Sequence, residues 1–195
     1  MKTLAALVLA LVMGSLAASP NAFAAPQEAT TPTQEPERYA YAQLGAAAHA
    51  AHSQTVGVLL PWPGFQPRWA GGHWQGHVDI WLAHWAARRA DGGPAGHARA
   101  TSLGITPTLR VSPSAHARWF LDAGVGLTLS DRHYSNHRRE LTTRYNFATH
   151  AGAGLWLNAE HSHALSLRVE HISNAGIKTP NPGENFLQLR YQASF

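Results

Sequence analysis

The sequence of 195 residues contains no cysteine, so disulfide bonds cannot stabilise it. Exported proteins often depend on disulfides, and this chain must hold its fold by another means. It also has only one long apolar run, from Leu4 to Ala18, and its mean hydropathy is −0.22. Hydropathy alone therefore suggests a soluble mature protein. A transmembrane β-barrel gives the same weak signal, because its lipid-facing and interior residues alternate.

The amino terminus predicts export. Lys2 gives a short basic start, the apolar run follows, and Ala22-Phe23-Ala24 has the small residues that signal peptidase recognises. We therefore predict a signal peptide over residues 1–24. A membrane anchor is the alternative, but the apolar run is shorter than the ~20 residues of a spanning helix.

The next segment, residues 25–38, is polar and proline-rich and lacks large apolar side chains. It cannot bury enough surface to become ordered, and we interpret it as a flexible polar linker. Residues 39–195 then suit a single domain.

Negative charge is scarcer than positive charge, with 11 Asp and Glu residues against 15 Lys and Arg, a formal net charge of +4. This excess allows an anionic partner without naming it. We expect no nucleic acid, because the chain is predicted to be exported. Anionic lipid head groups are the better candidates.

Apolar and polar residues alternate in the carboxy-terminal half of the chain. The alternation runs over 119–129, 147–157, 165–170 and 187–195, and it predicts strands with one apolar and one polar face. Four earlier strands are expected over 39–52, 55–69, 77–87 and 101–111. Eight strands are enough to close a small barrel whose interior is filled by side chains.

The connections alternate in length when they are counted back from the carboxy terminus. Long connections are expected over 175–184, 130–146 and 88–100, and short ones over 158–163 and 112–116. Outer-membrane barrels pair long extracellular loops with short periplasmic turns. The predicted fold is therefore all-β, an eight-stranded antiparallel transmembrane β-barrel in the cell outer membrane. A soluble β-sandwich also alternates and is the alternative fold, although seven Trp and the terminal Phe195 favour the membrane barrel.

The segment His171-Ile-Ser-Asn-Ala-Gly-Ile-Lys-Thr-Pro-Asn-Pro-Gly-Glu184 contains the residue types of a serine esterase. A serine hydroxyl is a poor nucleophile until a neighbouring base takes its proton, and that base needs a third group to fix its tautomer. Residues i and i+2 of a strand point to one face, ~6.6–6.8 Å apart. His171 and Ser173 therefore share a face, and Glu184 returns from the far side of a loop.

This segment closely resembles the signature of the lipid A 3-O-deacylase family, the PagL-like enzymes, strongly over residues 171–191 and more weakly back to residue 77. The resemblance implies a hydrolytic triad with Ser173 as nucleophile, His171 as base and Glu184 as acid. This chain departs from the family at one point. The family's acid stands one residue further from the histidine, where this sequence has Asn185.

The resemblance also implies backbone oxyanion donors at Gly176 and Asn181, with Asn174 as a neighbouring polar support. It implies no cofactor. The expected reaction is hydrolysis of the acyl ester at the 3-position of lipid A. The expected partners are lipid A or lipopolysaccharide and the outer-membrane lipids, and a homodimer is compatible with this interpretation.

His171 and Ser173 share their parity with Leu165, Leu167 and Val169, which we expect to face lipid. The strand rises into a long loop, so the pair is expected at its extracellular end, on the outer wall. A polar pair on a lipid-facing stripe is costly unless it has a function. An enzyme that attacks a membrane lipid gains from this position, whereas a soluble hydrolase does not.

Thirteen histidines make chance pairings common. The segment His133-Tyr-Ser-Asn136 repeats the His-x-Ser-Asn pattern, but it lies in a long charged loop without the same sequel, and we interpret it as non-catalytic. The spacing of His161 and His163 could suit a metal ion, yet no carboxylate or third histidine follows at a useful distance. Glu170 and Glu140 are less favoured candidates for the acid.

Four arginines of the long loop either meet lipid A phosphates or form an ordinary solvated surface: Arg132, Arg138, Arg139 and Arg144. The alternative function for the whole chain is a non-catalytic small outer-membrane barrel that serves adhesion or membrane integrity. In that case the pair of His171 and Ser173 would be incidental.

Overall fold

The computed structural model of the protein describes residues 38–62, 65, 71–87, 98–136 and 139–195. The predicted signal peptide, and the predicted linker up to residue 37, lie outside the described residues. The regular structure within these ranges consists of β-strands. No helix in the described part of the chain is long and apolar enough to cross a membrane.

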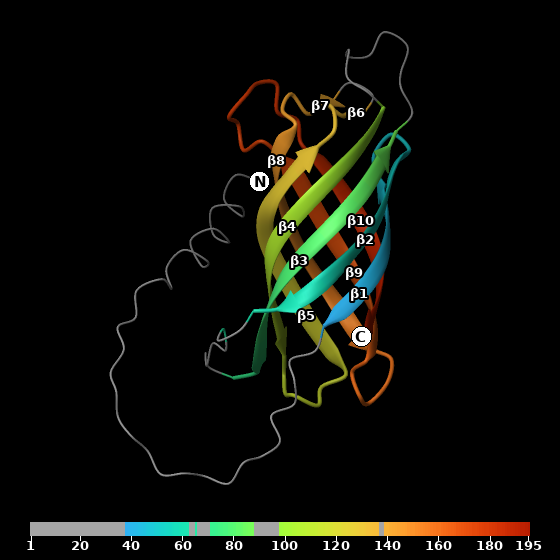
Figure 1. Cartoon of the computed structure of the whole chain (residues 1–195), viewed down its shortest axis with the longest axis vertical. Coiled ribbons are helices and arrows are strands. Elements are labelled where there is room, and N and C mark those ends of the chain that lie inside the picture. Colours follow the sequence, from blue (N-terminus) through green and yellow to red (C-terminus); the bar gives the residue numbers. More distant parts are fainter. Residues whose placement is uncertain (1–37, 63–64, 66–70, 88–97, 137–138) are drawn as a thin grey trace, which may run out of the picture. The chain divides into compact units, whose positions relative to one another are not determined.

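Eight antiparallel strands close into a barrel, in which the first strand pairs with the last (Figure 1). The order around the barrel is β1-β10-β9-β8-β5-β4-β3-β2. The prediction of an eight-stranded antiparallel barrel is confirmed. The strands are β1 (Tyr39–Ala47), β2 (Ala51–Pro61), β3 (His73–Ala86), β4 (Arg99–Ser112), β5 (Trp119–Ser130), β8 (Tyr145–Trp156), β9 (His163–Ser173) and β10 (Glu184–Ser194).

Two local features differ from the sequence-based expectation. The first turn lies at residues 48–50, so His52 belongs to β2 and not to the first strand. His49 and Ala50 both have a φ of 57°, a conformation that glycine or asparagine usually supplies in such turns, and neither is present. The second difference is a small hairpin, β6 (Ser135–Asn136) with β7 (Arg139–Glu140), inside the connection that was expected to be a loop.

The connections 131–144 and 174–183 lie at one end of the barrel, and the turns 113–118 and 157–162 lie at the other end with the carboxy terminus (Figure 1). Long loops mark the extracellular end of an outer-membrane barrel, and short turns mark the periplasmic end. The strand β9 therefore ends, and β10 begins, at the extracellular end.

The outer wall is apolar and the interior is largely polar. Asp79, in the interior, accepts hydrogen bonds from the hydroxyl of Tyr41 at 2.6 Å and from Arg190 at 3.0 Å. Buried charges need such partners to offset their desolvation. On β9 the alternation is as predicted: Leu165, Leu167 and Val169 are exposed on the wall, whereas Ser166, Arg168 and Glu170 are buried.

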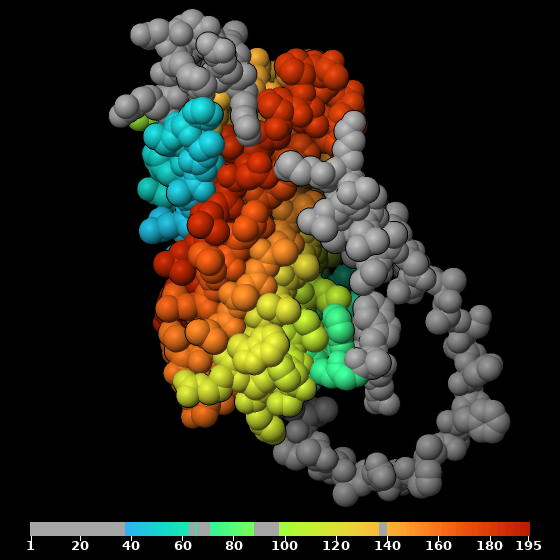
Figure 2. Space-filling view, turned by 180° about the vertical axis from the view of Figure 1, so that it is seen from behind, coloured from blue at the N-terminus to red at the C-terminus, as the bar shows by residue number. Residues whose placement is uncertain are grey.

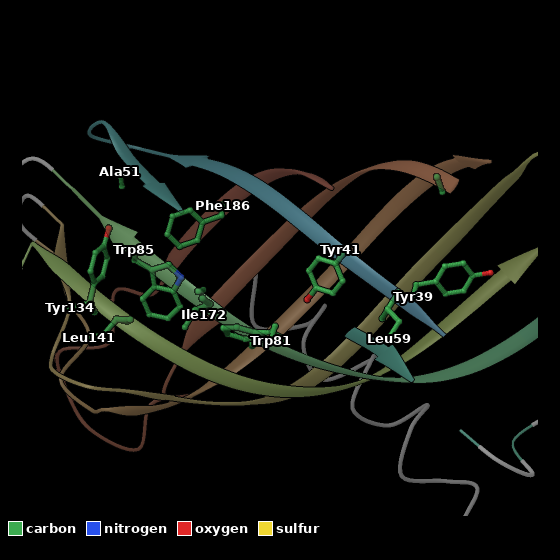
Figure 3. Packing of buried hydrophobic residues seen from close by; sticks show 14 of the residues in the cluster. Tyr39, Tyr41, Ala51, Leu59, Trp81, Trp85, Tyr134, Leu141, Ile172 and Phe186 are labelled. Carbon is green, nitrogen blue, oxygen red and sulfur yellow. The ribbon is translucent and has the colours of Figure 1, made fainter. Parts of the chain in front are cut away.

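Apolar side chains fill the interior near the extracellular end (Figure 3). The ring of Trp85 lies 5.7 Å from that of Tyr134 and 6.1 Å from that of Phe186. Leu141 and Ile172 belong to the same buried cluster. These five residues are called the extracellular plug below. Because Tyr134 and Leu141 come from the connection between β5 and β8, the plug anchors that connection to the barrel.

Candidate active site

His171 and Ser173 lie at the extracellular end of β9, on the outer face of the barrel. Ile172 between them is fully buried in the plug, whereas both polar side chains are partly exposed. The neighbouring strands bring Thr149 of β8 and Asn185 of β10 beside His171. Figure 2 shows the wall to which β8, β9 and β10 belong, with the loop 174–183 at its upper end. The predicted outward position of the pair is confirmed.

The imidazole of His171 has a defined partner. Its Nδ1 atom lies 2.8 Å from Oδ1 of Asn185. An amide oxygen can only accept a hydrogen bond, so Nδ1 of His171 carries the hydrogen and donates it. The other ring nitrogen, Nε2, then keeps its lone pair and can act as a base.

The structure does not bring Glu184 to His171, so the residue predicted as the acid lies away from the imidazole in this arrangement. Glu184 pairs with Ile172, so its side chain points into the barrel and is only 2% exposed. Its Oε2 atom accepts a hydrogen bond of 2.7 Å from the side-chain amide of Asn136. Alternation along β10 is the reason, because Asn185, one residue later, points outward to His171.

The two less favoured carboxylates also lie away from His171. Glu170 points into the interior, where it accepts a hydrogen bond of 2.7 Å from Gln188. Glu140 lies in β7, with Oε1 at 4.0 Å from Nδ1 of His133. Ser135, in the repeated motif, is buried. Unlike these three residues, Asn185 forms a hydrogen bond with the imidazole of His171.

Asn174 organises the loop 174–183 that follows Ser173. Its side chain is buried, with Oδ1 accepting from the backbone N–H of Gly176 at 2.9 Å and Nδ2 donating to the carbonyl of Lys178 at 2.8 Å. Its own backbone N–H donates to Oδ1 of Asn181 at 3.1 Å. The predicted support by Asn174 thus corresponds to a network within the loop. The N–H of Gly176, a predicted oxyanion donor, is bound to Asn174 in this arrangement.

Gly183 is a residue of the site that the sequence analysis did not identify. Its φ is +64°, and a Cβ atom built on it would lie 2.6 Å from Cε1 and 3.2 Å from Nε2 of His171. Both the backbone conformation and the close approach require glycine here. The dipeptide Pro182-Gly183 marks a turn in the sequence, but its contact with the imidazole depends on the fold.

The arginines considered for phosphate binding have local roles where the structure describes them. Arg132 pairs with Asp131 at 2.9 Å, and Nε of Arg144 donates to the carbonyl of Ser130 at 2.8 Å. Arg138 and the side chain of Arg139 lie outside the described residues.

The extracellular plug supports the site from inside the barrel. Ile172 separates His171 from Ser173, and Phe186 follows Asn185, so the inner neighbours of the site are packed in the plug. Reactive groups need to be held to a fraction of an ångström, and packed neighbours on regular strands provide that precision. Chemically, the arrangement offers a hydroxyl, an oriented imidazole and a polar loop on an apolar wall.

Comparison with known proteins gives one consistent relationship. The family model of lipid A 3-O-deacylase (PagL) matches residues 39–194. The chain is 38% identical over 79 residues to the lipid A deacylase PagL of Bordetella bronchiseptica, which covers 40% of this chain and 42% of that protein, less than half its length. It is 26% identical over 155 residues to the lipid A deacylase PagL of Pseudomonas aeruginosa, which covers 77% of this chain and 83% of that protein. A crystal structure of the outer membrane enzyme PagL superposes with a TM-score of 0.66 and 24% identity, over 80% of this chain and 99% of that chain.

Proposed function

Because this chain belongs to the lipid A 3-O-deacylase (PagL) family, we propose that it hydrolyses the acyl ester at the 3-position of lipid A. The observation that carries the proposal is the hydrogen bond of 2.8 Å between His171 and Asn185 on the outer wall. His171 stands two residues before Ser173 on the same face of β9. A polar group in contact with lipid is costly, and it is retained where it serves a function. The choice of the ester at the 3-position is inferred from the family. The serine esterase chemistry is supported by the residues on the outer wall.

The first half of the reaction forms an acyl-enzyme. Nε2 of His171 takes the proton of the Ser173 hydroxyl as Oγ attacks the ester carbonyl. The tetrahedral intermediate then expels the sugar oxygen, which receives that proton from the imidazolium and leaves as an alcohol. The acyl chain remains bound to Oγ of Ser173 as an ester.

The second half releases the acyl chain. His171 takes a proton from a water molecule, which attacks the acyl-Ser173 ester, and the same proton returns to Oγ as the ester breaks. The products are a 3-hydroxy fatty acid and free Ser173. Donors near the carbonyl oxygen stabilise both intermediates. The backbone N–H of Gly176 serves this role when it leaves Oδ1 of Asn174 and donates to the carbonyl oxygen of the substrate instead. Asn181 is the second donor position.

Asn185 takes the orienting role that the sequence analysis gave to Glu184. An amide oxygen fixes the tautomer of His171 as a carboxylate does, because it accepts the same hydrogen bond. It differs in having no charge to stabilise the imidazolium. The proposed group is therefore Ser173, His171 and Asn185, on the outer face of β9 and β10.

Substrate reaches this site sideways, within the outer leaflet. The wall below Ser173 carries exposed Leu167, Val169 and Leu187, which suit contact with acyl chains. The interior is filled with buried side chains such as Arg168 and Phe186, so a lipid has no route through the barrel.

Mass spectrometry of lipid A from Gram-negative cells with and without the expressed full chain tests this function. We expect lipid A that has lost one 3-hydroxyacyl chain, together with the free 3-hydroxy fatty acid. The variant Ser173→Ala should leave lipid A unchanged while still showing the heat-modifiable mobility of a folded barrel. Unchanged lipid A with folded wild-type protein, or full deacylation by Ser173→Ala, would overturn the proposal.

A further inference from the structure

We propose that Glu184 and Asn136 form a positioning pair, which holds Asn185 and through it the imidazole of His171 in the arrangement that catalysis needs. This inference rests on the proposed function. It assigns a role to a buried carboxylate that does not contact the imidazole, and to an asparagine of the motif interpreted as non-catalytic.

The pair joins two extracellular connections to the start of β10. The side chain of Asn136, in the hairpin β6–β7, is fully buried. Its Nδ2 atom donates to Oε2 of Glu184 at 2.7 Å and to the carbonyl of Ala48 at 2.8 Å. Ala48 lies in the turn between β1 and β2, and Glu184 is the first residue of β10. One amide group therefore ties the first turn and the hairpin to the strand that carries Asn185.

The other carboxylate oxygen reaches the residue that orients the base. Oε1 of Glu184 accepts a hydrogen bond of 3.1 Å from the backbone N–H of Asn185. The side chain of Asn185 leaves the same residue on the opposite face and accepts from His171 at 2.8 Å. The direction of a side chain on a strand is set by its own backbone. A hydrogen bond that fixes the backbone of Asn185 therefore also fixes the position of its side-chain Oδ1 atom.

The surroundings of Glu184 argue against a role in packing alone. Phe186 lies two residues after Glu184, and Tyr134 lies two residues before Asn136; both belong to the plug. An apolar residue at position 184 would therefore extend the packing of the plug. Within the described ranges, no ion pair involves Glu184. A buried carboxylate bound only by neutral donors is expensive to desolvate. Its two hydrogen bonds lead to Asn136 and Asn185, which is the connection that the positioning role needs.

A polarity swap tests the pair in the purified, folded full chain, assayed on lipid A in detergent micelles. Asn136→Asp places two carboxylates against each other and breaks the contact. We expect kcat to fall about 10- to 100-fold, because small displacements of catalytic groups have effects of this size. KM should stay within about twofold, since neither residue reaches the wall where substrate binds.

The double variant with Asn136→Asp and Glu184→Gln restores the contact between positions 136 and 184 with reversed polarity. It does not restore the hydrogen bond to the carbonyl of Ala48, so the recovery is expected to be partial. The amide introduced at position 184 donates to the carboxylate introduced at position 136, and its oxygen can still accept from the N–H of Asn185. We expect kcat to recover at least about fivefold over Asn136→Asp, a non-additive effect typical of residues in direct contact. A double variant no better than the product of the two single changes would overturn the pair.

The matched control is Glu170→Gln, the same chemical change at another buried interior glutamate, whose partner is Gln188. We expect its kcat to remain within about threefold of wild type, because an amide can also bind Gln188. An equal loss of kcat in Glu170→Gln and Glu184→Gln would overturn the specific role of Glu184.

The pH dependence of kcat/KM separates positioning from direct catalysis. Glu184→Gln should lower the rate at every pH and move the acid limb by less than about one unit, because Glu184 does not touch the imidazole and acts on it only through space. A displacement of the acid limb by more than about one unit would overturn the positioning role and favour Glu184 as the acid of the triad. Ser173→Ala in the same assay keeps the two proposals apart. If it is active, the proposed function fails. If it is inactive and the swap gives no recovery, only the positioning pair fails.

Discussion

The pattern His-x-Ser-Asn occurs twice in this chain, and the two copies have different surroundings. In residues 171–174, strand alternation turns His171 and Ser173 to the outer wall, beside Asn185. In residues 133–136, Ser135 is buried and His133 lies 4.0 Å from Glu140. A hydroxyl that is buried in this hairpin cannot reach a membrane lipid, whatever its sequence neighbours are.

The two asparagines of the motif, by contrast, behave alike. Asn174 is buried and holds the loop 174–183 through Lys178 and Gly176. Asn136 is buried and ties its own hairpin to the first turn and to the start of β10, through Ala48 and Glu184. The asparagine of the motif is therefore structural in both copies, whereas only the copy on the wall exposes its histidine and serine to lipid. In the function proposed here, the side of the strand, and not the local pattern, decides which histidine acts.

The largest expected difference between the two copies concerns their histidines. His171→Ala removes the proposed base, so deacylation should fall at least about 10³-fold, as it does when members of such triads are removed. His133→Ala removes a partly exposed side chain outside the proposed site and should stay within about twofold of wild type. Release of 3-hydroxy fatty acid by the two purified variants gives the ratio directly. Similar activities for both would mean that the two motifs are not distinguished as the structure indicates.

The second prediction tests the wall on which this difference depends. Leu167 is 54% exposed on the outer face, whereas its neighbour Ser166 is buried. Leu167→Arg should destabilise the inserted barrel by ~2–4 kcal/mol if it lies near the bilayer midplane, because a cation there contacts hydrocarbon. Ser166→Ala should change the stability by much less. Urea titration of the heat-modifiable folded form in lipid vesicles measures both. An arginine at 167 that costs nothing would contradict a lipid-facing β9.

The sequence was sufficient to predict the barrel and the outward face of β9, because both follow from alternation over long strands. The same alternation also indicates which residue of β10 lies beside His171. Leu187 and Leu189 were assigned to the apolar face, and continuing that parity backwards puts Asn185 outside and Glu184 inside. The family resemblance predicts a carboxylate as the third residue and therefore indicates Glu184, although the alternation along β10 indicates Asn185.

Other parts of the site depend on contacts between distant segments, and no local pattern indicates them. Asn136 and Glu184 are separated by 48 positions and meet only because the loops fold over the same end of the barrel. The turn at His49 and Ala50 lacks the residues that usually mark a left-handed turn. The dipeptide Pro182-Gly183 indicates a turn, but the close approach of Gly183 to His171 depends on how the loop folds.

The third prediction uses two glycines with similar backbones and different neighbours. Gly183 and Gly71 have φ values of +64° and +70°, so alanine is strained at either position. A Cβ at Gly183 would collide with His171, whereas one at Gly71 would meet no atom of the described residues within 4 Å. Gly183→Ala should therefore lower kcat by about 10- to 100-fold through displacement of the imidazole. Gly71→Ala should show only the loss of stability. Equal kcat values in the two folded variants would mean that the imidazole does not need the space that Gly183 leaves.

The smallest effect, and the most specific, is expected at the third member of the site. Asn185→Asp replaces a neutral acceptor by a carboxylate at the atom that binds Nδ1 of His171. A negative charge there favours the protonated imidazole, and the protonated ring cannot accept the Ser173 proton. The acid limb of the kcat/KM profile should therefore move to higher pH, by roughly one to three units for a close charge and toward the lower end on this partly exposed wall. At pH values above the limb, the variant should match or exceed the wild type, because the carboxylate stabilises the imidazolium that forms in the transition state. An acid limb that stays in place would mean that residue 185 does not contact the imidazole in the working enzyme, and would remove the difference between the two copies of the motif on which its assignment rests.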